Sequence, residues 1–226
     1  MQLHAVNEPF FPNLTTLDLW NIWQPLIPFI PLLLSPSITS ICLGSFASHL
    51  PGPVVASLIA NLPTPCPNLQ DITLRHLPRD PMITAAVSKM VFSINQSTLR
   101  EFHINSSLTK EASEVVYKLQ NLRGLSVVIK KGASISSALL PNLIRLQIEF
   151  EDGSDGLQFC REVKFGKLES VDFYIQSGRT GDFLEAFTGA ALSPSVQNTL
   201  SAIRLLTDWS WRLLSPSIYT AGTPEN

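Results

Sequence analysis

A chain of 226 residues with 16 basic and 18 acidic side chains has no excess of positive charge, so it predicts neither a nucleic-acid-binding protein nor one held on an anionic membrane. Charged residues make up 15% of the chain, below the roughly 25% of an average soluble domain, while 45% of the residues are hydrophobic. Cys42, Cys66 and Cys160 are too few and too far apart for a disulfide framework or a zinc site, so we expect reduced thiols and an intracellular protein, cytoplasmic or nuclear.

Residues 1–9 form an N-terminal extension without the basic and apolar segments of a signal peptide. The most apolar stretch, Leu26 to Leu34, is shorter than the roughly 20 residues that cross a bilayer, and two prolines interrupt it. We therefore expect no membrane association.

One motif then recurs through residues 10–214: an apolar residue, two free positions, a second apolar residue, one free position and a third apolar residue. Its eight copies start 21 to 32 residues apart. Their leading residues, in chain order, are Leu14, Ile38, Leu69, Leu99, Leu122, Leu143, Leu168 and Leu200. Because side chains alternate along a strand, the second and third apolar residues of each copy are expected in the core and the free positions around them outside. The pattern predicts about eight irregular repeats with one short strand each.

Proline and helical spacing mark the segments between these strands. Pro-Asn-Leu occurs three times, and each time its Leu is the leading residue of a copy. A proline at this place ends the preceding helix and restores an extended backbone. Helical returns are expected at 54–62, at 82–94, from a Ser107 or Thr109 N-cap to Leu119, and at 183–192 after a turn at 178–181. The returns at 26–34 and 132–140 are expected to be looser.

These elements predict an α/β fold: a leucine-rich-repeat solenoid, or horseshoe, with parallel strands on the concave face and helical or irregular returns on the convex face. The competing interpretation is an ordinary α/β sandwich of alternating strands and helices. Trp209 and Trp211 are expected to cover the C-terminal end of the core. Residues 215–226, rich in Ser, Thr and Pro, are expected to be a disordered tail.

The repeats resemble those of F-box/leucine-rich-repeat proteins, above all the divergent fungal ones. The turns Cys66-Pro67-Asn68-Leu69 and Leu140-Pro141-Asn142-Leu143 carry the resemblance, as does the Pro-Asn-Leu at residues 12–14. It implies a protein-protein interaction module, the substrate-recognition repeats of an SCF-type ubiquitin-ligase receptor. The F-box itself is absent, so a Skp1-type adaptor would be a partner only if an F-box lies upstream.

A second departure from that family concerns its side-chain ladder. The family places Asn or Cys two residues after the last apolar position of each repeat, and this chain keeps it once, at Asn21. We therefore expect no regular ladder there, and each return must satisfy its own backbone polar groups.

Motifs of enzymes do not occur: the chain lacks HExxH, GxGxxG, GxxxxGK[ST] and GxSxG. Glu101 and His103 share a face as any i, i+2 pair on a strand does, which leaves an acid/base pair open but does not favour one. We expect no enzyme activity, no cofactor and no metal.

The outward strand positions are the candidate surface for a protein partner on the concave face. Their mixed charges and aromatic residues are typical of protein-recognition surfaces, and Trp, Tyr and Arg often dominate interface energies. An alternative is that they are solvated strand residues of a truncated or non-functional structural fragment with no adaptor binding; an extracellular inhibitor-type repeat protein is a more distant alternative. The candidate binding residues are Asp18, Trp20, Arg75, Glu101, His103, Arg145, Glu149, Asp172 and Tyr174.

Overall fold

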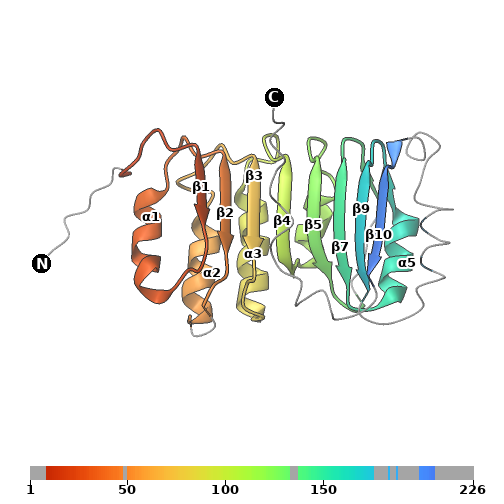
Figure 1. Ribbon diagram of the computed structural model, residues 1–226, viewed down its shortest axis with the longest axis horizontal. Coiled ribbons are helices and arrows are strands. Elements are labelled where there is room, and N and C mark those ends of the chain that lie inside the picture. Colours follow the sequence, from red (N-terminus) through yellow and green to blue (C-terminus); the bar gives the residue numbers. More distant parts are fainter. Residues whose placement is uncertain are drawn as a thin grey trace, which may run out of the picture.

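A parallel sheet carries the fold. The computed structural model describes residues 9–47, 50–132, 137–175, 183, 187 and 199–206. Within these residues the main sheet has eight strands, each hydrogen-bonded to the next in chain order (Figure 1). They are β1 (Thr16–Leu19), β2 (Ser40–Gly44), β3 (Asp71–Arg75), β4 (Glu101–Ser107), β5 (Gly124–Ile129), β7 (Arg145–Phe150), β9 (Ser170–Ile175) and β10 (Ala202–Leu206). The predicted α/β class and the eight predicted strands are confirmed.

The strands pair at equivalent motif positions. The second apolar residue of each copy lies opposite that of the next copy, from Leu17 opposite Ile41 to Val171 opposite Ile203. Just before the strands, a series of backbone hydrogen bonds of 2.7–2.9 Å from repeat to repeat fixes this register. In it each amide donates to the carbonyl of the preceding repeat, as Arg100 does to Gln70 and Arg123 to Arg100. The repeated sequence motif therefore becomes a repeated position in space.

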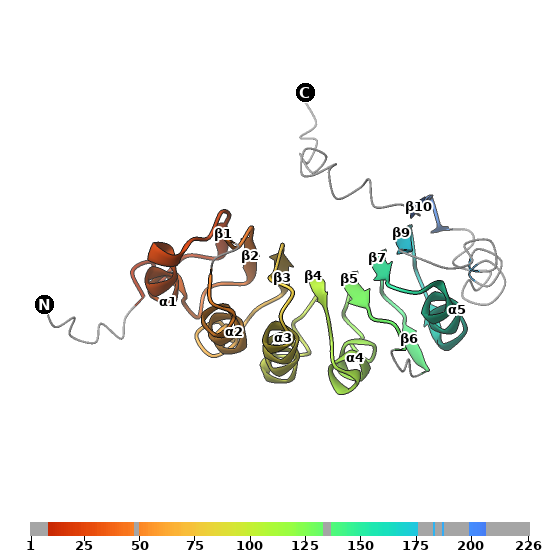
Figure 2. The same ribbon diagram turned by 90° about the horizontal axis from the view of Figure 1, so that it is seen from below.

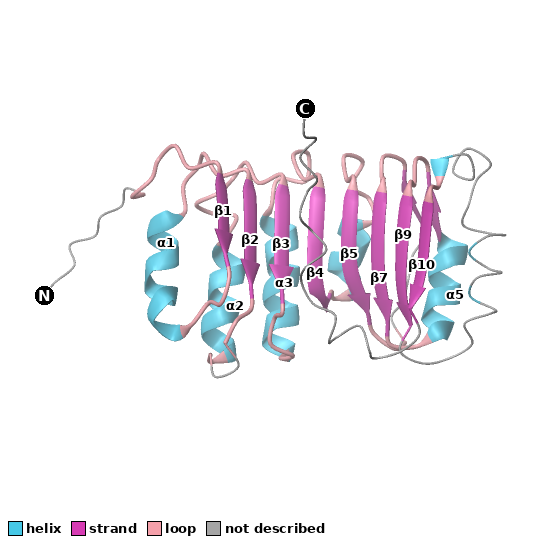
Figure 3. Cartoon of the chain, in the orientation of Figure 1, coloured by secondary structure: helices cyan, strands magenta, loops and turns pink. Residues whose placement is uncertain are grey.

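Helices cover one face of this sheet. They are the 3₁₀ helix η1 (Gln24–Phe29), α1 (Ile30–Leu33), α2 (Gly52–Asn61), α3 (Pro81–Ser93), α4 (Lys110–Val116) and α5 (Gly153–Glu162). All of the described helices lie on the same side of the strands, and the strands follow a shallow arc with the helices on its outer side (Figures 2 and 3). We call the other side the open face of the sheet.

Three of the predicted helical returns are confirmed as α2, α3 and α4. Asp80 caps α3, since its carboxylate accepts a hydrogen bond of 2.8 Å from the Met82 amide. Thr109 is the N-cap of α4, and its hydroxyl accepts from the Ala112 amide. Ser107, the other candidate cap, is the last residue of β4.

The return between β7 and β9 was not predicted. It contains α5, which Asp152 caps by accepting a hydrogen bond of 2.9 Å from the Ser154 amide. Gly153 and Gly156 weaken the helical pattern of this segment in the sequence. A small second sheet pairs β6 (Ala138–Leu140) with β8 (Val163–Phe165), so the described part of the return that leads to β7, which was expected to be looser, contains a short strand.

The core lies between the main sheet and its helices, and the inward motif positions fill it. In β2 to β9 both inward residues of every copy are buried, Ile41 and Leu43 of β2 among them. Ile203 of β10 is a correction, because 43% of its side chain is exposed instead of buried. β10 is the last strand of the described sheet and pairs with β9 alone, so it has no following strand to extend the core over Ile203.

The expectation that each return satisfies its backbone groups individually is wrong, because a regular ladder exists at another position. The residue just before the leading apolar residue donates a side-chain hydrogen bond to a backbone carbonyl of the preceding repeat. Asn68, Asn121 and Asn142 reach the carbonyls of Pro36, Ser97 and Gln120 at 2.8–3.1 Å. Thr98 and Thr199 reach those of Leu69 and Leu168 at 2.8–2.9 Å. The asparagine of the Pro-Asn-Leu turn thus has a structural role in joining consecutive repeats.

The position two residues after the last apolar residue of a motif copy adopts a special backbone conformation in three of the copies. Asn21, Ser45 and His76 all adopt a left-handed backbone, with φ of 55°, 54° and 52°. Asn tolerates this conformation better than most residues that have a side chain. These three positions turn the chain sharply at the carboxyl ends of β1, β2 and β3.

Other expectations fall partly or wholly beyond the described ranges. Of the return at 183–192, Phe183 and Phe187 are described and both pack edge-on against Phe173, with ring centroids 4.6 and 4.9 Å away. The turn at 178–181, Trp209, Trp211 and the tail at 215–226 lie outside the described residues, as does nearly all of the extension 1–9. All three cysteines are free thiols. In the part of the chain that the structure describes, no helix has the length and apolar character needed to span a bilayer.

Candidate binding surface on the open face of the sheet

The outward strand residues form three rows that run across the open face. The first row passes through Asp71, Glu101, Gly124 and Arg145, which successive strand pairings place side by side. The second row holds residues such as His103 two positions further along each strand, and the third holds Trp20 and its equivalents. Parallel strands lie about 4.8 Å apart, so side chains of one row are within reach of one another.

Three predicted residues, Glu101, His103 and Arg145, meet in what we call the Glu101 cluster. The Glu101 carboxylate lies 3.0 Å from Nε2 of His103 through one oxygen. Its other oxygen accepts a hydrogen bond of 2.7 Å from a guanidinium nitrogen of Arg145. Glu101 is 17% exposed and Arg145 64%, so a shielded carboxylate holds a solvent-facing cation.

Gly124 makes the Glu101 cluster possible. Arg145 is on β7 and Glu101 on β4, with β5 between them. Gly124 occupies the intervening position of the row, and a methyl group built there would overlap Oε2 of Glu101 and lie 3.1 Å from Nε2 of His103. The absent side chain therefore leaves the space in which the ion pair crosses β5.

The surroundings of Glu101 and Asp71 shift the pKa values of these two carboxyl groups in opposite directions. Burial raises the pKa of Glu101, but the hydrogen bonds from His103 and Arg145 outweigh it and hold that pKa below its ordinary value. For Asp71, burial and the neighbouring charge of Glu101 raise the pKa above its ordinary value. The fold therefore favours the charged form of Glu101 and disfavours the charged form of Asp71, which faces a like charge.

A second group, the Trp20 cluster, comprises Trp20, Gly44 and Arg75. A methyl group at Gly44 of β2 would lie 2.7 Å from the Trp20 ring, so the six-membered ring of the indole packs directly against this glycine. The guanidinium of Arg75 on β3 lies 6.0 Å from the ring centroid, at the outer limit of a cation–π contact. Trp20 remains 39% exposed and offers an aromatic surface beside a cation.

The four other candidate residues lie on the same face in smaller groups. Asp18 faces Cys42 across β1 and β2, and burial followed by the Asp18 charge raises the pKa of that thiol to about 11. Asp172, outward but buried, accepts a hydrogen bond of 2.8 Å from Nε of Arg204 on β10.

Glu149 and Tyr174 complete the set. They are paired residues of β7 and β9 in the third row, and both are half-buried. The open face therefore carries partly fixed charged and aromatic groups from β1 to β10.

The surroundings of two polar groups on the open face lower their reactivity. A raised thiol pKa keeps Cys42 protonated at neutral pH, and a carboxylate that is already paired with His103 and Arg145 is a poor proton acceptor. Among the described residues no group of three or more His, Cys, Asp or Glu side chains could hold a metal ion. The open face thus presents partly fixed charges and an exposed indole.

The sequence analysis named Glu101, His103 and Arg145 but not the glycine that lets them meet. Gly44 and Gly124 were outward residues without an assigned role, and a glycine in the middle of a strand is the signal that could have marked them as points of close approach. Asp71 and Arg204 were likewise left out of the candidate set, although both lie in the same rows. Comparison with known proteins assigns this surface to no family, since no family model, no curated protein and no solved structure matches the chain.

Proposed function

We propose that this chain is a protein-binding module, built as a leucine-rich-repeat solenoid, in which the open face of the sheet receives the partner. Three features support the solenoid: eight copies of one motif, strands paired in chain order, and five Asn or Thr side chains that tie a turn to the preceding one. Such stacks create extended concave surfaces, and binding is their common use.

One observation carries the functional proposal: the open face holds charged and aromatic side chains in fixed positions. Glu101 orients His103 and Arg145, and Gly44 lets the Trp20 ring pack against β2 beside Arg75. Groups that are already ordered lose less conformational entropy when a partner binds. Trp and Arg are also the residue types that most often dominate the binding energy of an interface.

The resemblance to F-box/leucine-rich-repeat proteins makes the proposal more specific. In such a receptor, the open face would hold the substrate of an SCF-type ubiquitin ligase, and an F-box would hold the Skp1-type adaptor. The test is to read the transcript upstream of the codon for Met1 and to express the longest product. We expect an in-frame F-box and co-purification of the adaptor; a longest product that binds no adaptor would contradict the ligase assignment.

The binding proposal itself is tested by changing two of the cations of the open face. A partner isolated with the wild-type chain is purified, and its Kd is measured for R75A/R145A and for K89A/K118A, a matched control that removes two exposed cations outside the open face. We expect R75A/R145A to weaken binding at least tenfold, about 1.4 kcal/mol, and the control less than twofold. Equal losses in the two variants, with both folded by circular dichroism, would contradict the proposal.

A further inference from the structure

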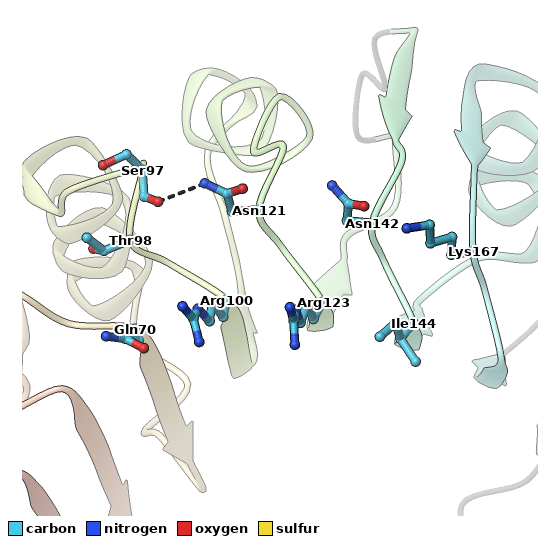
Figure 4. A pocket seen from close by; sticks show the side chains of 9 residues that line it. All are labelled: Gln70, Ser97, Thr98, Arg100, Asn121, Arg123, Asn142, Ile144 and Lys167. Carbon is cyan, nitrogen blue, oxygen red and sulfur yellow. Dashed lines mark hydrogen bonds between the residues drawn. The ribbon is translucent and has the colours of Figure 1, made fainter.

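A groove runs across the repeats at the amino-terminal ends of the strands, apart from both clusters of the open face. It has a volume of about 520 Å³ and lies before β4, β5, β7 and β9 (Figure 4). Two rows of side chains flank it: Gln70, Arg100 and Arg123 on one side, Asn121, Asn142 and Lys167 on the other. Because the repeats generate both rows, the groove continues in the direction in which the strands follow one another.

The groove is positively charged although the chain as a whole is not. Arg100, Arg123 and Lys167 line it, and no Asp or Glu is among its lining residues. The net charge of the whole chain is −2, so these three cations are a local concentration of positive charge. Two acidic residues lie beside this lining: the Asp71 carboxyl interacts with Arg100, and the exposed Glu169 follows Lys167 by two residues.

Arg100 and Arg123 stand at equivalent positions of neighbouring repeats. The Arg123 amide donates a backbone hydrogen bond of 2.7 Å to the Arg100 carbonyl, and Figure 4 shows the two side chains side by side. Like charges at directly opposite positions of neighbouring strands destabilise a sheet. Within the described part of the chain, the Arg123 side chain has no ion-pair partner that would offset this cost.

An anion between the two guanidinium groups would remove that repulsion. Guanidinium groups bind a carboxylate through paired N–H donors, and the strand spacing of about 4.8 Å lets one carboxylate contact both. Lys167 lies on the other side of the groove in the repeat of β9, two strands beyond Arg123 and so about 10 Å further along the groove. An extended peptide covers that distance in about three residues.

We infer that the groove binds an extended acidic peptide segment, with one carboxylate between Arg100 and Arg123 and a second near Lys167. The Gln70 amide adds a polar group along the same path, as do the side-chain oxygens of Asn121 and Asn142, whose nitrogens already bond the preceding repeat. Such a path suits a peptide backbone better than an isolated ion. Asp71 and the exposed Glu169 flank the groove and disfavour a long polyanion such as a nucleic acid. This site is separate from the proposed binding role of the open face and does not depend on it.

The experiment measures binding of a capped, fluorescent hexapeptide that carries Glu at positions 2 and 5 to the full chain at 50 mM salt. Its counterpart with Gln at the same positions is the neutral probe. The variant R100Q/R123Q removes the two groove arginines, and R79Q/K89Q removes two exposed cations elsewhere as the matched control. Circular dichroism and urea unfolding establish that each variant is folded.

We expect the Glu peptide to bind at least tenfold more tightly than the Gln peptide, and R100Q/R123Q to raise its Kd at least tenfold. K167Q should raise the Kd about threefold, and R79Q/K89Q less than twofold. Equal Kd values for the two peptides, or equal losses in the groove and control variants, would overturn the inference. So would inorganic phosphate that displaces the peptide at the peptide's own Kd, because the groove would then be a small-anion site.

A second measurement needs no substitution. If two carboxylates bind the groove cations, the Kd of the Glu peptide for the wild-type chain rises steeply between 50 and 200 mM salt, while that of the Gln peptide stays constant. A Kd of the Glu peptide that is independent of salt would overturn the inference even if a variant failed to fold.

Discussion

Arg145 on β7 donates a hydrogen bond of 2.7 Å to the carboxylate of Glu101 on β4, across a strand that contributes a glycine at that position. An ion pair that spans two strand intervals in a regular sheet requires a gap between its ends. The following predictions test how far this relationship organises the open face and how the repeats are joined.

Replacing Gly124 with Ala should destabilise the chain by about 1 kcal/mol, measured by urea unfolding at pH 7. Alanine in a strand is usually more stabilising than glycine by about 0.5–1 kcal/mol, so a loss of stability here would be opposite to the usual effect. The added methyl group would displace the Glu101 carboxylate and break its contacts with His103 and Arg145. Ser126→Ala, two residues along on the same face, is the matched control and should change stability by less than about 0.5 kcal/mol. A more stable G124A would contradict the role given to Gly124.

The stability that Glu101 contributes should disappear in acid. Its pKa in the folded chain lies below the ordinary value of the unfolded chain, so the ionised form favours folding. That contribution is complete above the ordinary glutamate pKa and is lost as pH falls through the lower folded value. E101Q should therefore be less stable than the wild type by about 1 kcal/mol at pH 7, and the difference should shrink between pH 5 and pH 3. Urea midpoints over this range provide the measurement; a constant difference would show that the carboxylate is not the group responsible.

Asp71→Asn should have the opposite effect and stabilise the chain at pH 7 by about 0.5 kcal/mol, the scale of one cross-strand pair. Asp71 is paired with Glu101 across β3 and β4, and its raised pKa shows that its charge is disfavoured in the folded state. That penalty is present above the folded pKa and absent below the ordinary aspartate value. Thermal unfolding at pH 7 and pH 3 should show the gain at the higher pH alone, and a destabilised D71N at pH 7 would contradict it.

Thr98→Val should cost about 1 kcal/mol, the net value of a typical hydrogen bond, because it keeps the shape but removes the hydroxyl that binds the Leu69 carbonyl at 2.8 Å. Thr64→Val is the matched control, since Thr64 is exposed just after α2. We expect its unfolding free energy to change by less than about 0.5 kcal/mol. Equal effects of the two substitutions would show that the ladder residues do not join the repeats.

The main sheet was predictable because its strands depend on a local pattern that recurs. Apolar residues at alternating positions determine which side of each strand is buried, as at Ile72 and Leu74, whatever the rest of the chain does. Helix α5 was not predictable in this way, since its two glycines lower its propensity and its helical state depends on packing of Phe159 against Phe150 and Tyr117.

The candidate site was predictable in its residue types but not in its contacts. Alternation places Glu101 and His103 on one face, which the sequence shows directly. The pairing of Glu101 with Arg145, 44 residues away, depends on strand order, register and the gap at Gly124 together. The ladder at Asn121 and Asn142 was missed because it occupies a different position from the ladder of the resembling family.

The central claim, that the open face receives a protein partner, is tested most directly by hydroxyl-radical footprinting of the chain with and without that partner. Trp20, His103 and Tyr174 report on the open face, while Met82 and Phe92 on α3, 49% and 51% exposed, are internal controls on the opposite face. We predict that the partner reduces oxidation of the three open-face residues and leaves Met82 and Phe92 unchanged. Protection of Met82 and Phe92, with Trp20, His103 and Tyr174 oxidised as in the free chain, would contradict the claim.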